Sequence, residues 1–184
     1  MTILKTERLT LRPITRGDED RHFDLMNNWN VAGNLARVPW PYLKEYAVEH
    51  VEKHVLAPAP GCFAIDLPGD GLIGVVVIGD DNPDFGAPEG TKQIGYWVGE
   101  PYWGQGYVTE ACRAALTYGF DEMQLNEIFA GVLVDNPASI RVLEKLGFEH
   151  VGAGEINVLA RGEKVASHRL RLGKSRWRAT QAIG

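Results

Sequence analysis

Two glycines, Gly104 and Gly106, flank a single glutamine in the segment Y-W-G-Q-G-Y-V-T-E-A, residues 102–111, and a helical pattern starts directly behind them. The N-terminus of a helix exposes free N–H groups and carries a partial positive charge, so it attracts anions. Glycines just before it let the backbone approach a phosphate, because no Cβ stands in the way. Residues 104–109 therefore have the chemistry of a diphosphate cradle, although a turn that binds no ligand would show the same pattern.

Two familiar phosphate motifs are excluded by the sequence. No segment reads G-x-x-x-x-G-K-[ST], so the chain has no P-loop. Thr109 stands where a dinucleotide-binding fingerprint requires its third Gly or Ala. A diphosphate site at the glycine segment would therefore be of a different kind.

Other reactive residue types form no recognisable catalytic set. No Ser-His-Asp or Cys-His arrangement is evident. Cys62 and Cys112 make no disulfide framework in a chain of this size, and both are expected to be inert. His50 and His54 share a helix face, but no third ligand is nearby, so no metal site is predicted. Glu110, in the first turn of its helix, is expected to be structural, because the helix dipole favours a carboxylate there.

The periodicity of the apolar residues predicts the elements that would position this segment. Strands are expected at residues 8–14, 62–67, 72–79, 93–99 and 127–134, with a final pair near residues 148–152 and 165–172. The strand at 72–79 is almost wholly apolar, as expected for burial on both faces. Helices are expected from about residue 18, over residues 43–55, from the glycines to residue 120 and from residue 137, and residues 30–42 are expected to form a loop.

The helix behind Asn136 has the clearest boundaries. Asn136 is a favourable N-cap, Pro137 suits the first helical position and Gly147 ends the helix. No repeat, linker or low-complexity tract divides the chain. We therefore expect one α/β domain over residues 1–184.

Composition limits the class of protein. The chain has 184 residues, of which 45% are hydrophobic and 23% charged, and its net charge is −5. Nucleic-acid phosphates are bound by clustered Lys and Arg, so this charge argues against a nucleic-acid partner. No apolar run could span a bilayer and no signal-peptide block is present, which predicts a cytoplasmic protein without a membrane partner.

The stretch H-R-L-R-L-G-K-S-R-W-R, residues 168–178, is locally basic. We expect an edge strand with a solvated face. The alternative is a patch that meets a phosphate or a partner subunit. An exposed final strand together with this basic tail could support a homodimer.

Three segments in order resemble one enzyme family. They are T-E-R-L-T-L-R-P-I at residues 6–14, I-G-Y-W-V-G-E-P-Y-W-G-Q-G-Y-V-T-E-A at residues 94–111 and D-N-P-A-S-I-R-V-L-E-K-L-G-F at residues 135–148. Together they resemble the GNAT acetyltransferases, in particular the branch with the ribosomal-protein N-acetyltransferases RimJ and RimL. The resemblance runs over about residues 6–172 and leaves a basic tail at 173–184. It implies an α/β (α+β) fold with a mixed, mostly antiparallel twisted sheet, two splayed parallel strands and flanking helices.

The resemblance implies acetyl-CoA as co-substrate and no metal. In the family the glycine loop holds the pyrophosphate, with the pattern Gln/Arg-x-x-Gly-x-Gly/Ala. Trp103, Gly106 and Val108 occupy the three defining positions, so two of them differ from the pattern. The pantetheine arm is expected between the splayed strands, against the backbone of Trp97 and Val98 and beside Asn136. The candidate contacts in the loop are Trp103, Gly104, Gln105, Gly106, Tyr107, Val108 and Thr109.

Acetyl transfer from a thioester by direct attack of an amine needs no nucleophilic side chain. Ser139 matches the serine of an N-x-x-S segment that RimL-like enzymes are proposed to use on the departing thiolate. Its alternative role is to cap the helix. Leu143 occupies the position at which many family members have a general-acid tyrosine.

The general base is less well defined by the resemblance. Gln93 replaces a glutamate that is common early in the glycine-loop strand, and a glutamine accepts no proton at neutral pH. Glu100 is our candidate for the base. Asp66, Asp80, Asp81 and a chain of waters are the alternatives.

The acceptor is expected to be a primary amine, either a protein N-terminus or a small molecule. Trp29, Trp40 and Tyr42, together with the acidic loop at residues 80–89, are the expected pocket walls. Aromatic rings beside carboxylates suit a cationic amine, although the same residues could simply pack and solvate. The substitutions at the family's defining positions also leave open a non-catalytic domain that binds CoA as a sensor or scaffold. These substitutions are Gln93, Leu143, Trp103 and Val108.

Overall fold

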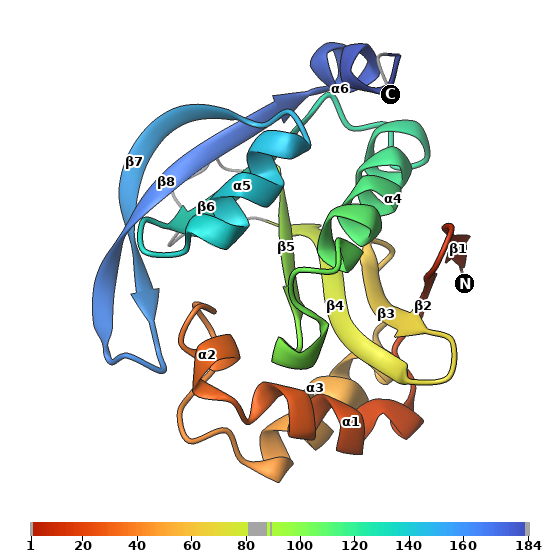
Figure 1. Ribbon diagram of the computed structural model, residues 1–184, viewed down its shortest axis with the longest axis vertical. Helices are drawn as coiled ribbons and strands as arrows, with labels where there is room; N and C mark the ends of the chain where they lie inside the picture. The colour runs from red at the N-terminus through yellow and green to blue at the C-terminus, as the bar shows by residue number, and fades with distance from the viewer. Residues whose placement is uncertain (1, 81–87, 89, 183–184) are drawn as a thin grey trace.

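A computed structural model describes residues 2–80, 88 and 90–182. Over these residues the strands form one eight-stranded sheet in the order β1-β2-β3-β4-β5-β6-β8-β7 (Figure 1). All neighbouring strands are antiparallel except β5 and β6, which are parallel. The strands are β1 (Leu4–Lys5), β2 (Thr10–Arg12), β3 (Cys62–Leu67), β4 (Gly71–Asp80), β5 (Lys92–Val98), β6 (Glu127–Leu133), β7 (Glu149–Val158) and β8 (Glu163–Gly173). The expected mixed, mostly antiparallel sheet is confirmed.

Helices cover both faces of this sheet. Helices α4 and α5 lie over one face, and α1 and α3 pack against the other face (Figure 1). The helices are α1 (Glu19–Met26), α2 (Trp29–Ala32), α3 (Lys44–Leu56), α4 (Tyr107–Asp121), α5 (Pro137–Lys145) and α6 (Lys174–Gln181), with 3-10 turns η1 (Arg16–Asp18) and η3 (Glu100–Tyr102). The helices predicted by periodicity are confirmed with small shifts at their ends.

The centre of the sheet is buried on both faces because its strands alternate between two cores. In β3, Phe63 and Ile65 contribute to the core beneath α4, whereas Cys62 and Ala64 contribute to the core beneath α1 and α3. Strand β4 divides in the same way. Its nearly continuous apolar sequence is what burial on both faces requires.

The sequence predicts a loop over residues 30–42. For the first residues of this segment the prediction is wrong. They belong to the short helix α2, which begins after Asn28. The Asn28 side chain caps it by accepting a hydrogen bond from the Asn30 N–H at 2.9 Å. A four-residue helix has no apolar periodicity to reveal it, and only its cap is visible in the sequence.

The basic stretch at residues 168–178 is not an edge strand, so that prediction is wrong. Strand β8 lies between β6 and β7, and β7 is the edge. The chain then forms α6, whose Trp177 is 3% exposed and stacks on Phe120 with ring centroids 6.0 Å apart. The exposed final strand expected as a dimer edge is therefore also wrong, because β8 is paired on both sides.

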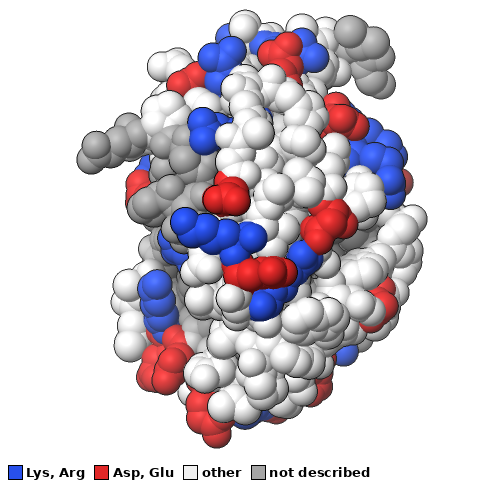
Figure 2. Space-filling view, turned by 90° about the vertical axis from the view of Figure 1, so that its left-hand side faces the viewer, with Lys and Arg blue, Asp and Glu red and all other residues white. Residues whose placement is uncertain are grey.

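Cations of this stretch have acidic neighbours. Arg171 lies 3.7 Å from Glu127, and Arg176 lies 3.0 Å from Glu149. Figure 2 shows basic and acidic side chains interspersed over the face that it displays. Two cations of the basic stretch, Arg171 and Arg176, are therefore paired with carboxylates.

A buried histidine pair joins α1 to α3. His22 is 1% exposed, and its ring lies 4.6 Å from the ring of His50. Within the described part of the chain, the Nε2 atoms of both histidines are buried without a hydrogen-bond partner. Burial, with a contribution from His54, lowers the pKa of His22 to about 4. Burial, together with His22, His54 and Lys53, lowers the pKa of His50 to about 3.

Because of this pair, we expect the folded protein to lose stability in acid. In the unfolded chain each imidazole has its ordinary pKa of 6.5, and above this pH both rings are neutral in either state. As the pH falls below 6.5 toward the pKa values in the folded protein, the unfolded chain takes up protons that the folded protein does not, so the folded state loses stability. At about pH 5 the loss should be roughly 2 kcal/mol per histidine in the free energy of unfolding. Urea unfolding at pH 7 and at about pH 5 would measure it. The double variant His22→Phe/His50→Leu should lose this dependence, whereas the half-exposed His150→Gln should keep it. An unchanged urea midpoint in the parent would contradict the prediction.

Candidate active site

The parallel strands β5 and β6 are joined at one point and then separate. Among the described residues their register consists of the pair Gln93 and Phe129, near the start of each strand. Beyond this pair the strands diverge (Figure 1), and we call the region past it the β5/β6 divergence. Helix α4 follows β5 and helix α5 follows β6. Both helix N-termini therefore lie near the carboxyl ends of the parallel strands, the edge at which such sheets bind ligands.

The glycine loop has the backbone that a diphosphate requires. Gly104 and Gly106 have φ angles of 73° and 82°, in the left-handed region that favours glycine. A Cβ on Gly104 would meet nothing within 4 Å, so this side of the loop is open. Gly106 is the N-cap of the 15-residue helix α4, and no side chain caps that helix. The loop and the first turn of α4 therefore have the backbone of an anion-binding helix N-terminus.

A network from the N-terminal segment fixes this loop. Glu110 accepts hydrogen bonds from the Thr6 hydroxyl at 2.6 Å, the Arg8 N–H at 2.8 Å and Arg8 Nε at 2.7 Å. Burial opposes ionisation of Glu110, but these donors hold its pKa below the usual range. Arg8 Nη1 also donates to the Gln105 carbonyl at 2.9 Å, and its guanidinium lies 4.6 Å from the Tyr107 ring centroid. The structural role expected for Glu110 is confirmed.

The two residues that depart from the family's loop pattern have structural partners. Trp103 Nε1 donates a hydrogen bond of 2.7 Å to the carbonyl of Val98, at the end of β5. The Val108 side chain packs against the main core beneath α4. The carbonyl of Trp97 faces β4, because a Cβ on Gly74 would lie only 2.2 Å from it. Val98 is therefore the residue of this pair whose carbonyl lies away from β4.

Helix α5 brings Asn136 and Ser139 to the divergence. Asn136 Oδ1 accepts a hydrogen bond of 3.1 Å from the Ser139 N–H and so caps the helix. The Ser139 hydroxyl takes no part in this cap, and it is hydrogen-bonded at 2.7 Å to the hydroxyl of Tyr96 on β5. Leu143 is 1% exposed and belongs to the core. Tyr96 was not singled out in the sequence, because its partner is on a distant element.

Glu100 lies at the start of η3, where it contacts the N-terminal helices. Its carboxylate accepts hydrogen bonds from the side-chain amides of Asn28 at 2.5 Å and Asn30 at 2.9 Å. The alternative carboxylates have other partners: Asp66 accepts from Arg12, and Asp80 pairs with Lys92. Asp81 and most of the acidic loop, residues 81–87 and 89, lie outside the described residues.

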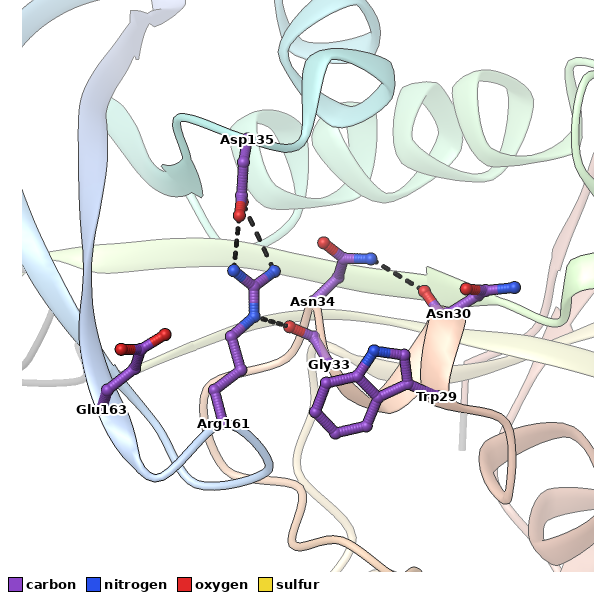
Figure 3. A pocket seen from close by; sticks show the side chains of 7 residues that line it. All are labelled: Trp29, Asn30, Gly33, Asn34, Asp135, Arg161 and Glu163. Carbon is purple, nitrogen blue, oxygen red and sulfur yellow. Dashed lines mark hydrogen bonds and ion pairs between the residues drawn. The ribbon is translucent and has the colours of Figure 1, made fainter.

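A cavity of about 420 Å³ lies between α2, the β6–α5 turn and the β7–β8 hairpin (Figure 3). Arg161 from the hairpin donates to the Gly33 carbonyl at 2.7 Å and to Asp135 at 2.5 Å. No partner is recorded for the Glu163 side chain among the described residues. The cavity is lined by Trp29, Asn30, Gly33, Asn34, Asp135, Arg161 and Glu163.

The three aromatic residues expected in the pocket wall lie in three different environments. Trp29 lines the cavity, and the Trp40 ring lies 5.5 Å from it in an edge-to-face arrangement. Tyr42 is 5% exposed and packs near His22, so it does not line this cavity. An aromatic residue in a loop sequence suits a core as well as a pocket, and the sequence does not distinguish the two.

The described residues contain no group of three or more His, Cys, Asp or Glu side chains that could hold a metal ion. Cys62 and Cys112 are free and buried, and burial raises the pKa of both thiols, that of Cys62 to about 11. No helix in the described part of the chain is long and apolar enough to cross a membrane.

Comparison with known proteins agrees with this geometry. Residues 8–149 match the family described as acetyltransferase (GNAT) domain. The chain is 45% identical over 150 residues to the uncharacterized N-acetyltransferase YnaD of Bacillus subtilis, covering 81% of this chain and 84% of that protein. A match to the probable N-acetyltransferase YjcK of Bacillus subtilis, 43% identical over 72 residues, covers only 39% of this chain and 40% of that protein. The crystal structure of a GNAT-family acetyltransferase from Bacillus anthracis superposes with a TM-score of 0.80 and 25% identity, over 95% of this chain and 99% of that one. The chain belongs to the GNAT acetyltransferase family.

Proposed function

We propose that this chain is a cytoplasmic, acetyl-CoA-dependent N-acetyltransferase that acetylates a primary amine by direct attack in a ternary complex. The observation that carries the proposal is the juxtaposition of an uncapped, glycine-preceded helix N-terminus with a hydroxyl pair at the β5/β6 divergence. Two free, buried cysteines are compatible with a reducing compartment. The N-x-x-S serine, Ser139, supports a RimJ/RimL-like assignment within the family.

The residues that would hold acetyl-CoA follow from the geometry of the loop and the divergence. The backbone N–H groups of residues 104–109 would bind the pyrophosphate, and Arg8 would hold the loop in place through the Gln105 carbonyl. Val98 and Asn136 flank the divergence and would contact the pantetheine arm. The co-substrate supplies the thioester whose acetyl group is transferred.

The reaction requires a neutral amine and a stabilised leaving group. The nitrogen attacks the thioester carbonyl, a C–N bond forms and the C–S bond breaks. The proton that the nitrogen loses is equivalent to the one that the sulfur gains. Ser139 is assigned as the hydrogen-bond donor to the departing sulfur. We assign Glu100 to the removal of the first proton from an incoming ammonium group, directly or through water, before the attack; this proton passes on to solvent.

The acceptor is assigned to the cavity beside α2. Its wall combines the Trp29 ring with the carboxylates of Asp135 and Glu163. Asp135 is paired with Arg161, so Glu163 leaves the wall with a negative charge. Primary amines are cationic in solution, and both an aromatic face and a carboxylate attract them. The proposed acceptor is therefore a primary amine, either of a small molecule or at the N-terminus of a protein.

A thiol-release assay with acetyl-CoA and a panel of primary amines tests the proposal. Ser139→Ala should lower kcat by about 10²-fold without changing acetyl-CoA affinity, because it removes only the hydroxyl. The variant keeps the helix cap, which uses the N–H of Ser139. Ser175→Ala, on the surface of α6, is the matched control and should be active. Binding of acetyl-CoA without thiol release for any amine would favour the non-catalytic sensor or scaffold.

A further inference from the structure

The side chain of Tyr96 bridges the two strands of the β5/β6 divergence. It originates on β5 and reaches Ser139 on α5, the helix that follows β6. Its hydroxyl oxygen lies 2.7 Å from Ser139 Oγ and 3.2 Å from the Ser139 carbonyl oxygen. Hydroxyl–hydroxyl hydrogen bonds are most frequent at 2.7–2.8 Å, and 3.2 Å is outside their usual range. The Oγ contact is therefore the stronger of the two.

Two arrangements of hydrogen are compatible with this contact, and they have opposite consequences. If Ser139 donates to Tyr96, the single Tyr96 hydrogen is left for the Ser139 carbonyl at 3.2 Å, and the only hydrogen of the serine hydroxyl is used inside the protein. If Tyr96 donates to Ser139, the serine hydrogen is free to turn toward the divergence. Ser139 is the only hydroxyl residue of α5, so the direction of this one bond decides whether a hydroxyl of that helix can donate to a ligand.

We propose that Tyr96 is a positioning residue that donates its hydrogen to Ser139 Oγ and thereby directs the serine hydrogen toward the sulfur of the leaving CoA. The inference rests on the proposed function and names a residue that the acetyl transfer uses indirectly. Tyr96 gives up no proton in the reaction. The C–S bond breaks, the sulfur accepts a hydrogen bond from Ser139, and the proton lost by the amine balances the one gained by the thiol.

The environment of Tyr96 suits a permanent donor. Its ring packs against the main core, together with Tyr107 and Val108 of α4. Burial, assisted by Cys112, raises the pKa of the Tyr96 hydroxyl above its ordinary value, despite the opposing hydrogen bond with Ser139. The phenol therefore stays protonated over the whole range in which an amine acceptor becomes neutral.

The variant Tyr96→Phe tests this role because it removes a single oxygen. We expect kcat to fall by about 10-fold, as for the loss of one oriented hydrogen bond, while acetyl-CoA affinity stays within about two-fold. Tyr118→Phe is the matched control, because Tyr118 also packs against the main core, edge-to-face with Phe63. It should retain parental kcat.

A double variant separates positioning from a merely structural contribution. In the Ser139→Ala background, Tyr96→Phe should cause no further loss of kcat, because its effect passes through the serine hydroxyl. The inference would be overturned if the two losses of kcat multiply in the double variant. It would also be overturned if Tyr96→Phe has the kcat of the parent protein. If Ser139→Ala alone reduces kcat and Tyr96→Phe does not, the positioning role fails and the proposed function stands. If the parent protein releases no thiol, both the positioning role of Tyr96 and the proposed function fail.

Discussion

Replacing Gly106 with tryptophan is expected to weaken acetyl-CoA binding by at least about 100-fold, because it changes the loop in two ways. Gly106 has a φ of 82°, which costs a residue with a side chain roughly 1–2 kcal/mol. Its Cβ would lie 3.3 Å from Arg8 Nη2, so the cation that fixes the loop would also be displaced. The indole would then cover the N-terminus of α4. Calorimetric titration with acetyl-CoA measures the loss directly.

A matched pair of glycines separates loss of the cradle from backbone strain. Gly104 and Gly69 have φ angles of 73° and 92°, and a Cβ on either would meet nothing within 4 Å. Gly104→Ala and Gly69→Ala should therefore lower the melting temperature by similar amounts, whereas only Gly104→Ala should change acetyl-CoA affinity. If Gly106→Trp folds and binds acetyl-CoA as the parent does, the glycine loop is not the cradle.

Replacing Arg12 with methionine is expected to lower the free energy of unfolding by about 3–5 kcal/mol. Arg12 donates to both carboxylate oxygens of Asp18, at 2.7 and 2.8 Å, and to Asp66 at 2.8 Å. Asp18 is only 4% exposed, and although burial opposes its ionisation, Arg12 and Thr15 hold its pKa below the usual range. Without the guanidinium, two carboxylates would face each other with no cation between them. Urea unfolding at pH 7 measures the difference.

An exposed ion pair nearby provides the control for this variant. Arg16 lies 3.7 Å from Glu52, and their side chains are 64% and 51% exposed. Arg16→Met should change the free energy of unfolding by less than about 0.5 kcal/mol, because solvent already screens this pair. A loss below about 1 kcal/mol for Arg12→Met would show that the buried network contributes little beyond its desolvation cost.

Features with a local cause were predictable from the sequence. The helix from Asn136 to Gly147 was recognised from its cap, its proline and its terminal glycine, and β4 from its continuous apolar run. The positive φ angles of Gly104 and Gly106 also have a local signature. The position of β8 inside the sheet was missed, because strand order depends on pairings between distant segments.

In the candidate site, too, local features could be predicted from the sequence, whereas contacts between distant segments could not. The glycine loop is contiguous in sequence, so its chemistry could be inferred before the structure. Arg8 and Glu110 are 102 positions apart, and Tyr96 and Ser139 are 43 apart. Residues whose roles depend on such partners carry no local signal. Tyr42 shows the same limit, because its aromatic type in a loop sequence predicts a pocket wall, whereas its burial beside His22 depends on a distant helix.

The hairpin contacts of Arg161 also determine the order in which the protein can assemble. The bond from Arg161 to Gly33 joins residues 128 positions apart, and the Leu159 N–H adds a second link to the Ala36 carbonyl. Long-range closures of this kind are entropically costly and tend to form late in folding. During synthesis the loop that carries α2 waits for nearly the entire chain before its partner emerges from the ribosome. The wall that Arg161 contributes to the cavity therefore cannot close until residue 161 has been synthesised, well after the glycine loop at residues 104–106.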